Sequence, residues 1–334
     1  MVVSTENPST AGTRRPIRHR HHCGYRANRF MLWLGGSCLP LGYAVVAVAA
    51  SWFWLTDQKA RQASADFLRR VLGSCPRPRR LAQTWRHLRI YGELTLDVSV
   101  ALAGYEHIHV EPPDIQLIKE ALRPDQGLLV LTGHVGCPEL AAAMIQGLGQ
   151  GRRVHIVRYR APDDPTEYFY RTHWKLLRDV HWINSIHPLS AGVQVMAALR
   201  NHDFVGMQAD RTTHGRSIPV MLLGRRAALP AGPFTAAVLS RAPVVTAFML
   251  REKRRYYRLH LSPLRYYDGS TDGPAVDQGA AIRRAAEDYV ADLEPLLKRY
   301  PYQWGNFYKF WELAPPAGSS AHSNSISQTG VSAT

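Results

Sequence analysis

The order of apolar and polar positions divides the chain into two parts. Between residues 57 and 102, apolar residues recur at helical spacing among lysines and arginines, which predicts two amphipathic helices. From Ile108 onward, short apolar runs alternate with longer amphipathic stretches. Such alternation is typical of an α/β fold, and we predict a mixed, mostly parallel central sheet flanked by helices.

The predicted elements follow from these runs. The expected strands lie at residues 107–110, 127–132, 153–158, 180–184, 203–208, 217–223, 243–250 and 256–262. The expected helices lie at residues 57–72, 81–102, 115–122, 138–147, 166–178, 190–200, 232–241 and 276–299.

Residues 30–56 carry no charged side chain, and this run of 27 residues exceeds the roughly 20 that cross a bilayer. Glycines and a proline interrupt it, and tryptophans near its ends suit a membrane interface. Three interpretations stay open: a single span, a re-entrant or interfacial hairpin, and a signal peptide with Ala47-Val48-Ala49 as its cleavage box. We favour a hairpin or shallow anchor, because basic residues flank the run on both sides.

Four regions are therefore expected. They are a basic flexible arm at residues 1–29, an apolar membrane anchor at 30–56, an α/β domain at 57–313 and a disordered tail at 314–334.

Charge indicates the kind of partner. The net charge is +15, of which residues 1–29 account for +5, so the body of the protein is strongly basic. Such a surface suits anionic lipid, phosphorylated substrates, an acidic carrier protein or nucleic acid. The four cysteines share no metal-binding or disulfide spacing. No G-x-S-x-G, Walker, H-E-x-x-H or G-x-G-x-x-G motif is present, which disfavours serine hydrolases, NTPases, zinc peptidases and dinucleotide enzymes.

The stretch GLLVLTGHVGCPE at residues 127–139 is the strongest candidate for chemistry. It predicts a buried strand, a turn that carries His134 and a helix that starts near Pro138, with Glu139 in its first turn. Strand ends of this kind deliver reactive side chains to the carboxyl edge of a sheet. A histidine that a carboxylate orients is a general base for a hydroxyl, so we predict that His134 and Glu139 are catalytic. On spacing alone, a structural histidine at a strand end explains the pair equally well.

Four further residues are candidate supporting residues. Arg158 and Arg160 follow a strand, where a cation meets a carbonyl, phosphate or carboxylate; a surface pair with a nearby aspartate is the alternative. Asp210 also follows a strand and would orient an arginine or a base, or else serve as a turn residue. Gly232 lies at a Gly-Pro helix start whose free N–H groups suit an oxyanion, or it simply breaks a loop.

Five motifs in order resemble the bacterial lipid A biosynthesis lauroyl/myristoyl acyltransferases, within the glycerolipid acyltransferase superfamily. TGHVGCPE at residues 132–139 is similar to the family's G-H-x-G-N-W-E block, with its H-x4-D/E motif. The other motifs are Tyr159-Arg160, Asp210, the run from Leu223-Gly224 to Pro230, Gly232 and Pro233, and the aromatic block from Pro301 to Trp311. On composition alone, that aromatic block is a packing plug or a membrane-facing belt.

The resemblance implies transfer of a fatty acyl chain from acyl carrier protein or coenzyme A to a hydroxyl of a membrane lipid. It also implies a bacterial inner-membrane enzyme that works at the cytoplasmic face, with no metal, no cofactor and no nucleic-acid partner. His134 would be the base, Glu139 its orienting partner, and Arg160 and Asp210 supporting residues. Gly136-Cys137-Pro138 replaces the usual Gly-Asn-Trp and Arg211 replaces a common Gln, so the acceptor is a lipid A precursor or another lipid or glycolipid.

Two other functions compete with this interpretation. One is a non-catalytic, basic protein of the membrane surface that binds anionic lipid. The other is a hydrolase that uses the same His/Glu pair to direct water onto acyl thioesters.

Overall fold

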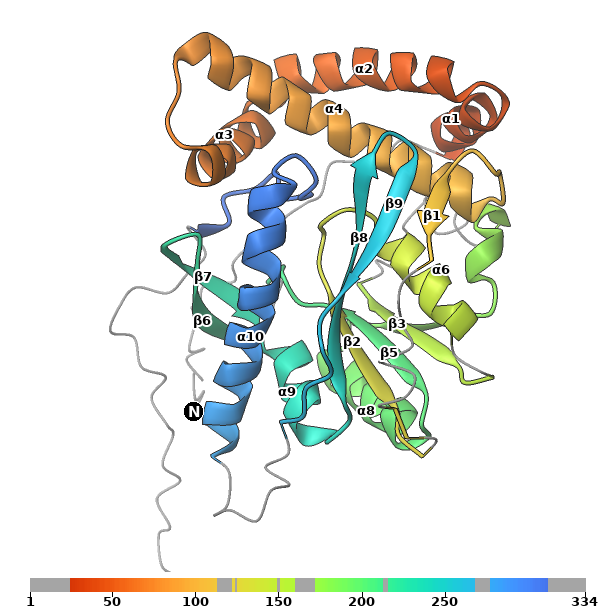
Figure 1. Cartoon of the computed structure of the whole chain (residues 1–334), viewed down its shortest axis with the longest axis vertical. Coiled ribbons are helices and arrows are strands. Elements are labelled where there is room, and N and C mark those ends of the chain that lie inside the picture. Colours follow the sequence, from red (N-terminus) through yellow and green to blue (C-terminus); the bar gives the residue numbers. More distant parts are fainter. Residues whose placement is uncertain are drawn as a thin grey trace, which may run out of the picture.

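A computed structural model describes residues 25–112, 122–123, 125–148, 151–159, 172–212, 216–267 and 277–311. Its centre is a seven-stranded sheet with the order β1-β9-β8-β2-β5-β3-β4, and β6 and β7 form a separate hairpin (Figure 1). The strands β8, β2, β5, β3 and β4 are mutually parallel. β9 runs antiparallel to β8 and parallel to β1. The predicted mixed, mostly parallel α/β sheet is therefore confirmed.

All eight expected strands form, with ends shifted by a few residues. They are β1 (His109–Glu111), β2 (Leu128–Thr132), β3 (Val154–Arg158), β4 (His181–Asn184), β5 (Phe204–Gln208), β6 (Ser217–Leu222), β8 (Val244–Lys253) and β9 (Tyr256–Leu261). A further strand, β7 (Arg225–Pro230), pairs antiparallel with β6 and was not predicted.

The central strand β2 is buried on both faces because its neighbours β8 and β5 lie in a sheet that helices cover on either side. Leu129 and Leu131 point into one core, which includes residues of α8 (Pro188–Arg200), α9 (Ala231–Leu239) and α10 (Gln278–Arg299). Leu128 and Val130 point into a second core with α4 (Arg77–Leu102) and α6 (Pro138–Leu148). This alternation explains why β2 reads as an unbroken apolar run.

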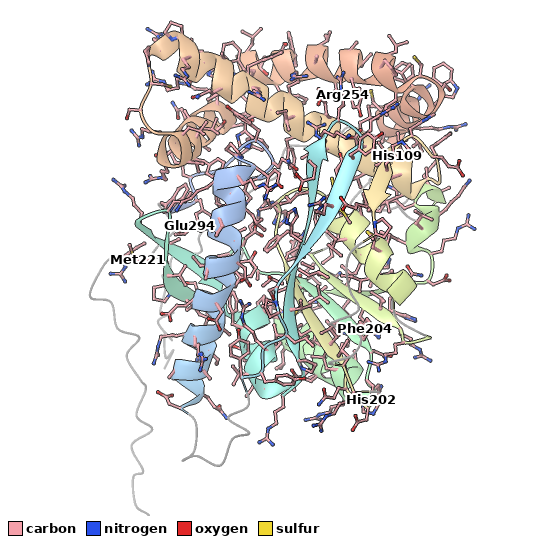
Figure 2. All side chains as sticks on the ribbon, in the orientation of Figure 1. His109, His202, Phe204, Met221, Arg254 and Glu294 are labelled. Carbon is pink, nitrogen blue, oxygen red and sulfur yellow. The ribbon has the colours of Figure 1, made fainter. Side chains whose placement is uncertain are left out.

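The N-terminal helices form a layer across one end of the sheet (Figure 1). They are α1 (Tyr25–Ser37), α2 (Leu39–Thr56), α3 (Gln58–Leu72) and α4. The uncharged run is thus divided at Cys38, and α4 begins four residues earlier than expected. Figure 2 shows Arg254, at the β8–β9 turn, beside this layer, and His202 at the opposite end of the sheet. The carboxyl ends of the parallel strands therefore face the N-terminal helices.

Three sequence predictions concern residues outside this description. The helix expected at 115–122 lies almost wholly outside the described residues, as does most of the helix expected at 166–178. The described end of the latter forms a short 3-10 helix, η1 (Lys175–Leu177). Most of the N-terminal arm and the tail at 314–334 also lie outside the described residues.

His87 of α4 links the helical layer to the rest of the protein, and its buried imidazole makes the stability of the fold depend on pH. Its Nε2–H donates to the Trp304 carbonyl at 2.9 Å, and the Ser64 hydroxyl donates to its Nδ1 at 2.9 Å. Burial lowers the pKa of His87 to about 4, against an opposing effect of the Trp304 carbonyl.

Because the folded pKa lies below the ordinary value of 6.5, the unfolded chain takes up a proton first as pH falls. The stability from neutral His87 is complete above pH 6.5, and roughly 3 kcal/mol of it is lost between pH 6.5 and about 4. Denaturant unfolding at several pH values measures this, with His87→Gln as the non-titrating control. Equal pH dependence in both proteins would contradict the assignment.

Candidate active site

His134 lies in the turn that joins β2 to α6, as the sequence predicts. The turn depends on Gly136, whose φ of +67° lies in the left-handed region that other residues avoid. A Cβ at this position would lie 1.9 Å from the Met249 carbonyl oxygen of β8. Only glycine therefore lets the chain pass β8 this closely. The turn leaves the His134 side chain 21% exposed at the carboxyl edge of the sheet.

The carboxylate that orients His134 is Asp210, not Glu139. The Nδ1–H of His134 donates to Asp210 Oδ1 at 2.8 Å, and its backbone N–H donates to Oδ2 at 2.9 Å. Asp210 follows β5, the strand beside β2, so the two residues meet at adjacent strand ends. The prediction that Glu139 orients the imidazole was wrong, because Asp210 already occupies Nδ1. No described residue bonds the His134 Nε2, which is therefore the nitrogen that can accept a proton.

Glu139 lies in the first turn of α6, where the sequence placed it. Its side chain makes no hydrogen bond to another described residue. It lies near the Tyr91 hydroxyl of α4. Burial is the main reason that the pKa of Tyr91 is raised to about 12. Arg211 lowers this pKa, and the nearby Glu139 carboxylate raises it. Glu139 thus borders the same polar region as Asp210 and Arg211, and its catalytic role stays a prediction.

Asp210 is held as an anion in a buried setting. Its exposed fraction is 2%, and burial by itself raises the pKa of a carboxyl group. His134, Arg211 and a hydrogen bond from Trp304 outweigh burial and lower the pKa of Asp210 to about 2. The Trp304 indole N–H donates to Oδ2 at 2.9 Å. Asp210 therefore stays ionised at physiological pH and fixes one tautomer of His134, the one with its free lone pair on Nε2.

A segment near the end of the folded chain completes the turn. The Gly136 N–H donates to the Gln303 carbonyl at 2.8 Å, and the Gly305 N–H donates to the His134 carbonyl at 2.7 Å. Gln303 also bonds the backbone of β8 through both atoms of its amide group. From composition alone, the aromatic block from Pro301 to Trp311 was interpreted as a packing plug or a membrane-facing belt. The block does pack in the core, but its peptide groups also bond the His134 turn, and the Trp304 indole N–H bonds Asp210.

Arg211 provides a cation beside the pair. Its guanidinium donates to the Gly305 carbonyl at 2.7 Å and lies over the Tyr308 ring, 5.3 Å from the ring centre. It also contributes to the low pKa of Asp210. The sequence drew attention to Arg211 only as a departure from a family pattern. The feature of the sequence that could have indicated its place in the site is that Arg211 directly follows Asp210.

Cys137 is not a nucleophile in this arrangement, although it lies three residues from His134. Its side chain is fully buried in the core with α4 and α6. Burial, together with nearby carboxylates, raises the pKa of the thiol well above its ordinary value. A thiol that stays protonated and inaccessible does not attack a thioester.

Three predicted supporting residues remain. Arg160 lies outside the described residues. Arg158 ends β3, which β5 separates from β2. Gly232 is exposed in the first turn of α9, and a Cβ there would meet no atom within 4 Å. For Arg158 and Gly232, a role in the site stays a prediction.

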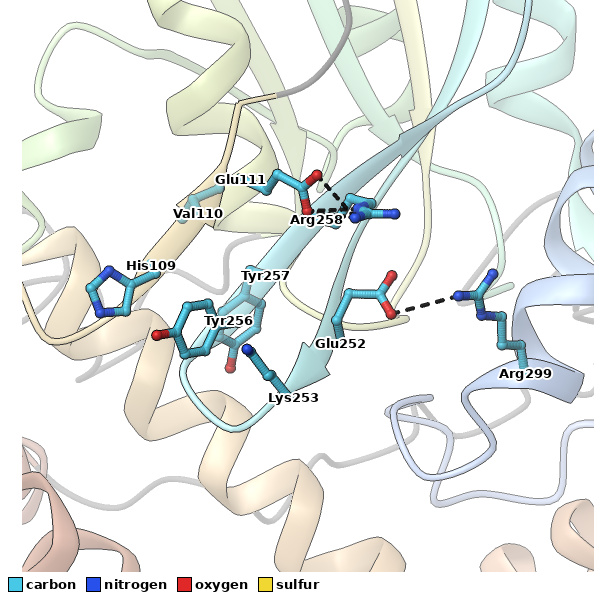
Figure 3. A pocket seen from close by; sticks show the side chains of 9 residues that line it. All are labelled: His109, Val110, Glu111, Glu252, Lys253, Tyr256, Tyr257, Arg258 and Arg299. Carbon is cyan, nitrogen blue, oxygen red and sulfur yellow. Dashed lines mark hydrogen bonds and ion pairs between the residues drawn. The ribbon is translucent and has the colours of Figure 1, made fainter.

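A groove of about 560 Å³ lies away from the pair, along β1, β9 and β8 (Figure 3). Its charged side chains largely satisfy one another. Arg258 pairs with Glu111 at 2.7 Å, Arg299 lies 3.7 Å from Glu252, and Lys253 lies over the Tyr256 ring. His134 does not line this groove. The His134–Asp210 pair therefore remains the best candidate for the reacting centre.

A model of the bacterial lipid A biosynthesis acyltransferase family matches residues 48–311 of the chain. The chain belongs to this family. A comparison with curated proteins found no significant match. The family match covers β2, the His134 turn, Asp210 and Trp304, so all parts of the site described above lie within it. As a lipid A biosynthesis acyltransferase, the protein is an enzyme that transfers acyl groups, which confirms the function class and the family that the sequence motifs indicated.

Proposed function

We propose that this acyltransferase moves a fatty acyl chain from a thioester donor to a hydroxyl group of a lipid A precursor or a related membrane glycolipid. The observation that carries the proposal is the 2.8 Å hydrogen bond from His134 Nδ1 to Asp210, which leaves Nε2 available on a partly exposed ring. A base of this kind suits direct transfer to an alcohol.

The reaction then proceeds in two steps. His134 Nε2 takes the proton of the acceptor hydroxyl as its oxygen attacks the thioester carbonyl carbon. The tetrahedral intermediate collapses, the C–S bond breaks, and the imidazolium returns its proton to the departing thiolate. Asp210 stabilises the imidazolium between the two steps and keeps the ring in one orientation, as the carboxylate does in Ser-His-Asp enzymes.

Arg211 is the residue best placed to stabilise the oxyanion of the intermediate. Its guanidinium is held by the Gly305 carbonyl and the Tyr308 ring beside Asp210. A fixed cation in a half-buried site stabilises developing negative charge more strongly than water does. In this proposal Glu139 and Tyr91 border the acceptor, while Arg158, Arg160 and Gly232 contact more distant parts of the substrates.

The donor is an acyl carrier protein or coenzyme A, and the enzyme works at the cytoplasmic face of the bacterial inner membrane. Two features support this. The net charge of +15 attracts anionic lipid and acidic or phosphorylated donors. Among the described residues, helix α2 is long and apolar enough to cross a membrane by length and composition.

The test is product analysis with the purified full-length enzyme in detergent micelles. Acyl carrier protein thioester or acyl-coenzyme A is supplied with a lipid A precursor. We expect mass spectrometry to find the acceptor heavier by one ester-linked acyl group, with one free thiol released for each ester formed. Free fatty acid as the main product would instead support a hydrolase, and an unconsumed donor would support a non-catalytic lipid-binding protein.

A further inference from the structure

Helix α2 exposes an apolar stripe along its length. Leu41, Val48, Trp52 and Leu55 are exposed by 51%, 72%, 65% and 65%, and their spacing of seven, four and three residues places them on one face. Helix α1 adds two exposed aromatic rings, Phe30 and Trp33, whose centres lie 6.0 Å apart. Soluble surfaces rarely expose so continuous an apolar face, which marks a surface that binds lipid or protein.

The opposite face of α2 lies along α4. The contacts begin with a hydrogen bond from the Tyr43 hydroxyl to Asp97 at 2.7 Å near one end of α2. In the middle, Gly92 lets the helices approach, because a Cβ there would lie 2.9 Å from a methyl carbon of Val46. Near the other end, the Trp54 indole donates to Thr84 at 2.9 Å. Figure 1 shows α2 lying across the molecule on top of α4.

This pairing disfavours a membrane-crossing orientation of α2. A span would place α4 at the same depth in the bilayer, and α4 carries the exposed Arg86 and the buried acids Glu93 and Asp97. Charged residues at that depth are costly.

We propose that α1 and α2 lie in the plane of the membrane and insert one apolar face into a single phospholipid leaflet. The inference deepens the membrane association proposed above. The lipid is favoured over a protein partner because aromatic rings lie toward both ends of the stripe, as in interfacial helices. A cation also lies at the end of the stripe: the Arg61 guanidinium bonds the carbonyls of Trp54 and Leu55.

The orientation brings the reacting centre close to the lipid. The side of α4 that faces away from α2 carries His87 and Tyr91, and these reach Trp304 and the polar region around Asp210. Within the described residues, α4 thus lies between α2 and the polar region around the His134–Asp210 pair. A lipid acceptor leaving the membrane beside α4 would reach the base without crossing the sheet.

Flotation with vesicles of phosphatidylethanolamine and phosphatidylglycerol tests the surface. The double variant Val48→Glu/Trp52→Glu should lower the vesicle-bound fraction by about tenfold or more, because it puts two charges into the apolar face. Met221→Glu, which alters an exposed apolar residue of β6, is the matched control and should float like the wild type. Unchanged flotation of the double variant would overturn the proposal, as would a wild-type dimer that this variant dissociates.

Labelling with a membrane-impermeant maleimide on sealed vesicles tests the orientation. Three single-cysteine proteins are compared: one with Arg26→Cys before α2, one with the native Cys38, and one with Gln58→Cys after α2. The other accessible cysteines are changed to Ser in each. An in-plane anchor exposes all three to the same side. Labelling of positions 26 and 58 from opposite sides would establish a span, and protection of Cys38 alone would establish a re-entrant hairpin. Neither measurement needs turnover, so failure of the catalytic proposal is detected separately.

Discussion

His134→Ala is expected to lower kcat for acyl transfer by about 10²–10⁴-fold, the range for loss of a general base, while KM changes little. The side chain is partly exposed and packs in no core, so the fold should persist. Purified variant and wild type are compared in the thiol-release assay, with ester formation measured by mass spectrometry. Added imidazole should restore part of the rate by filling the space left by the ring.

The chain provides a matched control for this variant. His155 forms a similar pair, with its Nε2 3.0 Å from an oxygen of Asp203. Asp203 precedes β5, whereas Asp210 follows it, so the control pair lies at the opposite end of the sheet. His155→Gln should retain activity within about threefold, because this half-buried pair lies at the opposite end of the sheet from His134 and Gln keeps a hydrogen-bonding side chain. Normal turnover by His134→Ala would remove the imidazole from the mechanism.

Asp210→Asn is expected to reduce kcat by about 10²–10⁴-fold, because an amide neither fixes the productive tautomer nor stabilises the imidazolium. The substitution preserves size, and an amide oxygen can still accept from the His134 backbone and the Trp304 indole. Loss of activity with a retained unfolding temperature therefore reports on the carboxylate itself.

Glu139→Gln is the companion variant, and it separates the two candidate carboxylates. Glu139 makes no hydrogen bond to the imidazole, so its loss should act mainly on KM for the acceptor. A larger loss of kcat in Glu139→Gln than in Asp210→Asn would restore Glu139 as the partner of His134. Trp304→Phe should lower kcat more than Glu139→Gln and less than Asp210→Asn, since it keeps an aromatic ring and removes only one hydrogen-bond donor to Asp210.

Much of the sheet was predictable because each strand is a short apolar run between polar turns. β2 is the clearest case, since both of its faces are buried and every position from Leu128 to Leu131 is apolar. β7 was missed because Arg225 and Arg226, both exposed, open it and hide its pairing with β6. The break at Cys38 was foreshadowed by Gly35-Gly36 and Pro40, which interrupt the uncharged run.

The site was predictable in its histidine but not in its carboxylate. Spacing along the chain favoured Glu139, five positions from His134, over Asp210, which is 76 positions away. The order of strands decides between them, and a single sequence does not show that β5 lies next to β2. Trp304 was hidden for a related reason: an aromatic cluster signals packing, and the direction of one indole N–H is a property of the folded chain.

The bonds from Gln303, Trp304 and Gly305 also set an order of events during synthesis. Helices α1 and α2 leave the ribosome first, and the residues that hold His134 and Asp210 in place are among the last of the described chain to emerge. Under the proposed anchoring, a growing chain meets the lipid surface before the proposed base is held in place. Catalytic competence would then arise only after the enzyme has reached the membrane that supplies its proposed acceptor.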